Sequence, residues 1–253
     1  MAFDSSDRTN EIIAENLLRA HRAGQSIQTA PLAVPADASA AMHIQALVQA
    51  QLARSVGGWK VAIGPEKVPV SAPLLDILPD ACEISLVPDC MIEVELAVRL
   101  RKDLPKRASA PYTRAEILDA VESLVLGIEV IGGRYARSAN VPFLMFLADH
   151  LGNRAYVIGD ELPLSAIDEA HGLTCRVTLD GTLLHEGPAT HPAGDPLLPL
   201  LAYANTPSDA LGGLKAGQLV TTGTLCGVLP VQTSGLLTAR LGDIGQITLR
   251  FIP

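Results

Sequence analysis

Aromatic residues are scarce in this chain of 253 residues, in which Phe, Trp and Tyr together make up 4%. Lys and Arg form no cluster that would follow a phosphate backbone, and the formal net charge is −8, so we do not expect nucleic-acid binding. No apolar run approaches the roughly 18 residues of a membrane span. The N-terminal residues lack the apolar core of a signal peptide, so we expect a cytoplasmic protein with no membrane contact.

Cysteine pairs and common catalytic motifs are also missing. Four cysteines are present, but none forms a C-x-x-C pair or has a His at zinc-finger spacing, and we expect free thiols in a reducing compartment. No G-x-G-x-x-G fingerprint, P-loop, G-x-S-x-G elbow or H-E-x-x-H pair occurs. These absences argue against dinucleotide-binding, P-loop, serine-hydrolase and zinc-protease functions.

What the chain does contain is apolar residues (48%) together with many Gly and Pro, 21 and 18 respectively. This composition predicts a sizeable core and many short strands and turns. Apolar periodicity predicts helices over 7–23, 39–56, 113–126 and 197–204. Strands are predicted over 58–64, 91–101, 127–132, 173–179, 182–185, 218–222, 236–241 and 245–251. The expected fold class is therefore α+β, with an N-terminal helical region (1–56) and a β-rich catalytic body (57–253).

Glu93 and Glu95 lie two residues apart on the predicted strand 91–101, so both side chains leave the same face. One interpretation is an amphipathic strand with this face in water, because the alternate positions are uniformly apolar. The other is that two carboxylates directed at one point form half of a site for Mg²⁺ or Mn²⁺.

Glu129 is the only charge in the apolar run 124–131, where burial of an isolated carboxylate would cost several kcal/mol. It needs a cation, either an Arg or Lys partner or a metal shared with Glu93 and Glu95. Lys60 presents the same problem in the run 58–64. It is either a residue on a wet strand face or a group in a cleft that orients a substrate carboxylate or transfers protons.

Taken together, these segments resemble the fumarylacetoacetate hydrolase superfamily, and more narrowly its branch of 2-oxopent-4-enoate hydratases and 2-oxo-3-hexenedioate (4-oxalocrotonate) decarboxylases. The resemblance runs along nearly the whole chain. The residues that carry it are Gly58-Trp-Lys-Val61, Ile92-Glu-Val-Glu-Leu-Ala97, Asp103-Leu-Pro105, Ile128-Glu-Val130, Arg134, Leu147-Ala-Asp149, Tyr156-Val-Ile-Gly159, Asp180-Gly181, Thr222-Gly-Thr224 and Gly227.

The resemblance implies a mixed β roll or barrel-like body with a smaller helical region. It implies that Glu93, Glu95 and Glu129 bind Mg²⁺ or Mn²⁺, that Lys60 is catalytic, and that Thr224 lines the substrate pocket. Asp76 is a further candidate for substrate binding, in place of an acid that the family carries near this loop. A homo-oligomer is also implied.

The implied activity is that of a metal-dependent lyase acting on a small unsaturated 2-oxo acid. The leading hypothesis is hydration of 2-hydroxypenta-2,4-dienoate in aromatic meta-cleavage catabolism, through a dienolate that the metal stabilises. The alternatives are a 2-oxo-3-hexenedioate decarboxylase, an acylpyruvate-type C–C hydrolase and a non-catalytic relative that binds a metal or ligand. The last is motivated by His150-Leu151-Gly152, which stands where the family usually has Asn-Ala-Ser.

Overall fold

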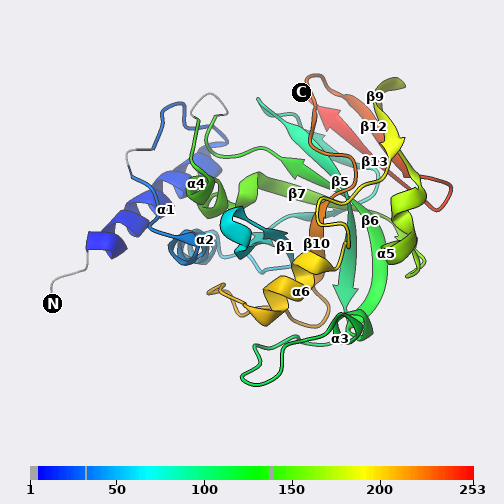
Figure 1. The fold of residues 1–253 in the computed structure, drawn as a ribbon. Helices are drawn as coiled ribbons and strands as arrows, with labels where there is room; N and C mark the ends of the chain where they lie inside the picture. The colour runs from blue at the N-terminus through cyan, green and yellow to red at the C-terminus, as the bar shows by residue number, and fades with distance from the viewer. Residues whose placement is uncertain (1–4, 32, 137–139) are drawn as a thin grey trace.

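The computed structural model describes residues 5–31, 33–136 and 140–253, which build two β-sheets, two longer helices near the N-terminus and several short ones (Figure 1). The strands are β1 (Gly58–Ile63), β2 (Pro69–Leu74), β3 (Ile77–Pro79), β4 (Cys82–Ser85), β5 (Met91–Leu100), β6 (Val121–Ile131), β7 (Asn153–Leu162), β8 (Thr174–Leu179), β9 (Thr182–Pro188), β10 (Leu219–Thr224), β11 (Leu229–Pro230), β12 (Gly235–Leu241) and β13 (Gly245–Ile252). The helices are α1 (Ser5–Ala23), α2 (Ala38–Leu52), α3 (Arg114–Asp119), α4 (Phe143–Ala148), α5 (Ala166–Glu169) and α6 (Leu198–Asn205). This arrangement confirms the expected α+β class with a curled, mixed sheet as its body.

The larger sheet has the strand order β2-β1-β10-β5-β6-β7-β3, with β11 also paired to β5. Its centre is the antiparallel ladder of β5 and β6, which have 10 and 11 residues. The smaller sheet has the order β4-β13-β12-β8-β9. The main apolar core contains side chains of both sheets, including Ile92, Val94, Leu126 and Leu249.

The N-terminal helices form a second apolar cluster with part of the larger sheet. Asp37 caps α2 by accepting a hydrogen bond from the backbone N–H of Ala40, at 2.8 Å. Apolar residues of α1 and α2 pack against β2 and α4, and Figure 1 shows these helices gathered at one side of the molecule. A later segment, α4, thus shares the core of the helical region. The division at residue 56 stays a prediction.

The prediction of a helix over 113–126 followed by a strand over 127–132 is wrong in its boundaries. Thr113 and Glu116 do form the expected capping box, but α3 ends at Asp119 and β6 begins at Val121. This segment pairs with β5, and Leu124 and Val125 pair with β7 as well, so its apolar side chains are buried in the centre of a sheet. Pairing with two neighbouring strands outweighs the helical spacing of these residues.

The four cysteines are free, as expected. Among the described residues, no helix combines the length and the hydropathy needed to cross a bilayer.

The contact between the half-buried His21 and the buried His150 should make stability depend on pH. The rings of His21 and His150 meet edge to face, 5.9 Å apart. Burial and the nearby charges of Arg134, Arg54 and Arg154 lower the pKa of His21 to about 3. The unfolded chain takes up this proton near pH 6.5, whereas the folded protein does not, so acid favours unfolding between these values. At pH 5 this difference costs about 2 kcal/mol.

The variant His21→Phe keeps an aromatic ring against His150 but cannot take up this proton. When the pH falls from 7.5 to 5, its free energy of unfolding should therefore decrease by about 2 kcal/mol less than that of the wild type. Urea unfolding at both pH values measures the difference. The control is His43→Gln, because His43 is exposed on α2 and its replacement should leave the acid-induced loss as in the wild type. Equal losses in His21→Phe and wild type would contradict this explanation.

Candidate metal centre

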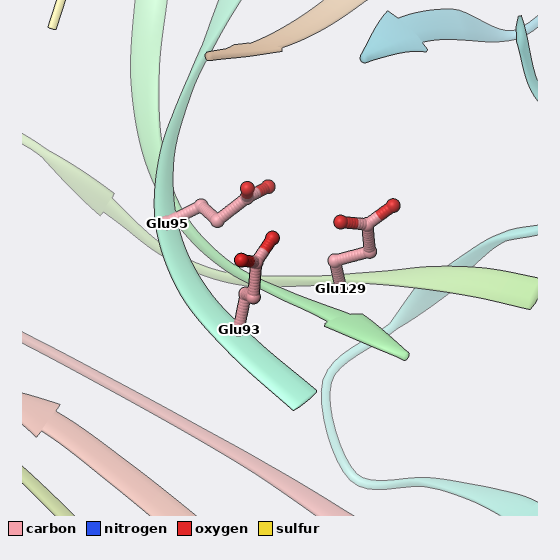
Figure 2. Close-up of side chains that lie close together, drawn as sticks. All are labelled: Glu93, Glu95 and Glu129. Atoms are coloured by element: carbon pink, nitrogen blue, oxygen red, sulfur yellow. The ribbon is translucent and has the colours of Figure 1, made fainter. Parts of the chain in front are cut away.

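Three glutamates meet on the central ladder of the larger sheet. Glu93 and Glu95 belong to β5, and Glu129 belongs to β6, directly opposite Glu93 in the strand register. Opposite residues of an antiparallel pair project from the same face, and so does a residue two positions along. The three carboxylates therefore share one space, which Figure 2 shows between the two strands.

This space is not the wet face of an amphipathic strand. Glu95 and Glu129 are fully buried, Glu93 is 8% exposed, and one oxygen from each carboxylate lies within 4.8 Å of the others. Both faces of β5 are covered, so the polar side of its alternating pattern faces the interior. The interpretation of Glu93 and Glu95 as solvated residues is therefore wrong.

Lys60 provides the positive charge nearest to this cluster. It lies on β1, which pairs with β10, and β10 in turn pairs with β5. Its Nζ is 2.7 Å from Glu93 Oε2, contacts Glu129 Oε2 and is 3.8 Å from Glu95 Oε1. The expected lysine partner of Glu129 is thus present, but this single ammonium is shared among three carboxylates.

Neutral groups hold two of the carboxylates in place. Asn153, at the start of β7, donates its Nδ2–H to Glu129 Oε1 at 2.8 Å. Thr221 on β10 donates its hydroxyl to Glu95 Oε2, and the Tyr156 hydroxyl lies 3.4 Å from Thr221 Oγ1. These contacts orient the carboxylates from strands on both sides of the ladder.

The absence of a side chain at position 127 allows this arrangement. Gly127 is opposite Glu95 in the β5–β6 register. A Cβ atom at this position would lie only 2.0 Å from the Tyr156 hydroxyl, so the tyrosine occupies the space that a larger residue would fill. The glycine thereby lets Tyr156 reach Thr221 below Glu95.

The acidity of the glutamates reflects competition between burial and the Lys60 charge. Burial raises the pKa of Glu129 to about 7 and that of Glu95 well above its usual value, in spite of the lysine. Burial also opposes ionisation of Glu93, but the Lys60 charge and hydrogen bond outweigh it and lower the Glu93 pKa. Burial disfavours the charged form of Lys60, but the three glutamates outweigh it and raise its pKa.

The residues fit a divalent cation. Three carboxylates in one buried space offer the hard oxygen ligands that Mg²⁺ and Mn²⁺ prefer. Glu95 Oε1 is buried and accepts no hydrogen bond from any described residue, although such an atom normally has a partner. One ammonium cannot neutralise three carboxylates, so a second cation would compensate the charge that remains.

A cavity of about 550 Å³ opens beside this cluster. Lys60 and Glu93 line it, together with Thr222, Gly223 and Thr224 from the end of β10. The cluster is therefore buried on the protein side but accessible to a ligand that enters the cavity.

The turn after β10 places Thr224 where the resemblance implied, in the cavity lining. Its Oγ1 donates to the Gly227 carbonyl at 2.9 Å and accepts from the Cys226 N–H at 3.2 Å. The hydroxyl thus stabilises its own turn. Gly223 has a φ of +134°, a conformation that L residues rarely adopt.

His191 is a cavity residue that the sequence reasoning missed. Its Nδ1 accepts a hydrogen bond from the Ala193 N–H at 3.2 Å, so its Nε2 is the nitrogen that donates to the Thr222 carbonyl, also at 3.2 Å. Both ring nitrogens are therefore engaged, Nδ1 within the loop that carries His191 and Nε2 with the backbone of β10. No spacing motif could have indicated this role, because it depends on a contact across 31 residues.

The structure does not bring Asp76 to this cavity. Its carboxylate pairs with Arg54 at 2.7 Å, both side chains are 46% exposed, and it lines a different cavity beside Arg134 and Arg154. Its position thus gives no support to the predicted contact with substrate.

The segment that departs from the family pattern lies next to a buried ion pair. Arg134 binds the Asp149 carboxylate and donates to the carbonyl of Asn153 at 2.9 Å. Residues 150–152, between Asp149 and Asn153, all have positive φ, and Leu151 lines the cavity. The family's Asn and Ser positions are occupied here by His150 and Gly152, and the residue of this segment that lines the cavity is the apolar Leu151.

The fold and the cluster thus define an α+β protein with a buried tricarboxylate centre that opens into a ligand-sized cavity. The family model described as Fumarylacetoacetate (FAA) hydrolase C-terminal matches residues 59–251. The chain belongs to this family, as the sequence resemblance indicated.

Its relatives include hydratases, and a decarboxylase shares its fold. A 2-keto-4-pentenoate hydratase of Paraburkholderia xenovorans is 25% identical over 259 residues, covering 95% of this chain and 94% of the relative. Another, from Paraburkholderia phymatum, is 27% identical over 160 residues, and the match covers 63% of this chain but only 60% of that relative. The structure of a 4-oxalocrotonate decarboxylase from Pseudomonas putida G7 in complex with magnesium and adipate has the same fold. It aligns with a TM-score of 0.80 at 18% identity, covering 98% of this chain and 99% of that one.

Proposed function

We propose that this protein is a divalent-metal-dependent lyase that hydrates a 2-hydroxy-2,4-dienoate, the enol form of an unsaturated 2-oxo acid. The observation that carries the proposal is the buried cluster of Glu93, Glu95 and Glu129, which shares one lysine and opens into a cavity. The 2-keto-4-pentenoate hydratases among its relatives support the same reaction class.

In this proposal, Glu93, Glu95 and Glu129 hold Mg²⁺ or Mn²⁺. When bound, such an ion polarises the carbonyl of a 2-oxo acid and stabilises the negative charge that develops beside it. Asn153 and Thr221 keep two of the carboxylates in position by donating hydrogen bonds to their outer oxygens.

Lys60 acts on the substrate in this proposal. Its Nζ lies beside Glu93 in the lining of the cavity, where it can donate a hydrogen bond to the substrate carboxylate or carry a proton. The dienol gains a proton at C5 and loses the proton of its 2-hydroxyl, which gives the 2-oxo-3-ene. Water then adds across the C3–C4 double bond, with its hydroxyl at C4 and a proton at C3. Buried apolar walls around the carbon chain limit the access of other water to this intermediate.

Decarboxylation of 2-oxo-3-hexenedioate and C–C hydrolysis of an acylpyruvate need the same stabilisation of an enolate, so both remain alternatives, as does a non-catalytic binder. The decarboxylase of P. putida shares the fold at 18% identity, and a similarity at this level indicates the fold but not the substrate. We include in the proposal a cytoplasmic location, a homo-oligomeric assembly and a role in aromatic catabolism.

The test follows the absorbance of 2-hydroxypenta-2,4-dienoate with protein stripped of metal by a chelator. We expect decay only after Mg²⁺ or Mn²⁺ is added, with 4-hydroxy-2-oxopentanoate as the product. Calorimetric titration with Mn²⁺ is run in parallel. Metal binding without decay would overturn the hydratase proposal, and release of carbon dioxide from 2-oxo-3-hexenedioate would then identify the decarboxylase.

A further inference from the structure

Away from the carboxylates, the wall of the cavity is apolar. Val70 and Ile131 line it from the larger sheet, Phe143 and Phe146 from α4, and Leu151 from the turn that follows. A substrate held by its 2-oxo acid end near Glu93 would therefore place the rest of its carbon chain against aliphatic and aromatic side chains. Such a surface stabilises an apolar group that leaves water.

The apolar wall contains no partner for a second carboxylate. Among the described residues that line the cavity, the charged ones are Lys60 and Glu93, which lie together at the acidic end. The ring nitrogens of His191 are already engaged by the backbone. A carboxylate placed against the apolar wall would lose its hydration without gaining a cation or a side-chain donor from the residues of that wall.

The rim of the cavity is also apolar, although it is in contact with solvent. Ile63, Leu198 and Val228 line the cavity and are 38%, 38% and 47% exposed. Exposed apolar groups that gather around a cavity indicate a binding surface. The volume of about 550 Å³ lies within the range that encloses drug-sized ligands, and a five-carbon acid would leave much of it unfilled.

We propose that the site selects 2-hydroxy-2,4-dienoates that carry an apolar alkyl or aryl group at C5, and that it discriminates against dioic acids. This inference rests on the proposed function and specifies its substrate class. The 2-oxo acid end lies at the glutamate cluster, the diene crosses the wall formed by Ile131 and Phe146, and the C5 substituent reaches the rim at Val228.

The test compares kcat/KM for 2-hydroxypenta-2,4-dienoate, its 5-phenyl derivative and 2-hydroxyhexa-2,4-dienedioate, all with saturating Mg²⁺. We expect the phenyl compound to exceed the five-carbon acid by at least about tenfold, because it buries additional apolar surface. The dioic acid should fall below the five-carbon acid. A dioic acid that equals or exceeds the phenyl compound would overturn the inference, and so would a five-carbon acid that matches the phenyl compound.

A binding experiment separates this inference from the proposed reaction. Calorimetric titration of the Mn²⁺-loaded protein with 2-oxopentanoate, 2-oxo-5-phenylpentanoate and 2-oxohexanedioate requires no turnover. If none of the dienoates reacts, the proposed function fails, but tightest binding of the phenyl acid still supports the apolar site. Equal affinities for the three acids would overturn the inference even in an active enzyme.

A variant at the rim tests the location. Val228→Arg adds a cation next to the proposed position of the C5 group, so we expect it to lower KM for the dioic acid and raise KM for the phenyl compound. Leu183→Arg is the matched control, because Leu183 is a 52% exposed apolar residue on β9 that does not line this cavity. The same KM values in Val228→Arg and Leu183→Arg would show that the substituent does not reach the rim.

Discussion

Glu129→Gln should weaken the binding of Mg²⁺ and Mn²⁺ at least about 100-fold, because in the proposed site it removes a carboxylate that binds the ion directly, and even loss of a residue that only positions a ligand costs roughly 10- to 100-fold. The substitution keeps the size of the side chain and its place on β6. It replaces a carboxylate oxygen beside Lys60 with either an uncharged carbonyl or an N–H group that repels the ammonium. Calorimetric titration of chelator-stripped protein measures the affinity, and turnover at low metal concentration should fall with it.

The same strand offers the control for this experiment. Glu122 lies on β6 with an exposed side chain, so Glu122→Gln makes the same chemical change outside the cluster and should retain wild-type affinity. Thermal unfolding without metal identifies a variant that fails to fold. If Glu129→Gln fails to fold, the metal titration is carried out with Glu93→Gln instead, because Glu93 lies at the edge of the cavity. Unchanged metal affinity in a folded Glu129→Gln or Glu93→Gln variant would show that the cluster does not bind the ion.

Part of this centre could be predicted from local sequence. Strand alternation alone places Glu93 and Glu95 on one face, and the apolar surroundings of Glu129 show that its charge needs a partner. Alternation could not show whether that face is wet or buried. The answer depends on β1, β10 and the cavity wall, which come from distant parts of the chain.

The partners of the glutamates could not be predicted from spacing, because they depend on strand pairing. Lys60 contacts Glu129 across 69 residues, although β10 and β5 lie between their strands in the sheet. Asn153 and His191 likewise act through contacts that no local pattern encodes. The family resemblance implied a catalytic Lys60 and a substrate-binding Thr224, and both line the cavity, whereas Asp76 lines a different one.

Secondary structure was predictable where periodicity and burial agree. The helix that begins at Thr113 was recognised by its capping box, but its end was misplaced. The run Val121–Leu126 is mostly apolar, and a short run of this kind fits a helix and a buried strand equally well. Pairing with β5 and β7 decides between them.

Lys60→Met should separate metal binding from turnover. The variant keeps an unbranched side chain in the space beside Glu93 and Glu129 but removes the ammonium that a bound ion must otherwise tolerate. We therefore expect Mg²⁺ and Mn²⁺ affinity to be retained or increased. At saturating metal, kcat should fall by about 100-fold or more, as expected for loss of a group that transfers a proton or orients the reacting acid.

The same variant should make the fold dependent on metal. Without its cation, the buried cluster must either keep uncompensated carboxylates or protonate them, so the metal-free variant should lose up to about 3 kcal/mol of stability. Added Mn²⁺ should restore the melting temperature, because an ion that binds only the folded state stabilises it. The control is Lys215→Met, since this lysine pairs with Asp103 at the surface and its loss should change neither property. Loss of metal affinity in Lys60→Met would mean that the lysine organises the ligands, and unchanged kcat would remove it from the reaction.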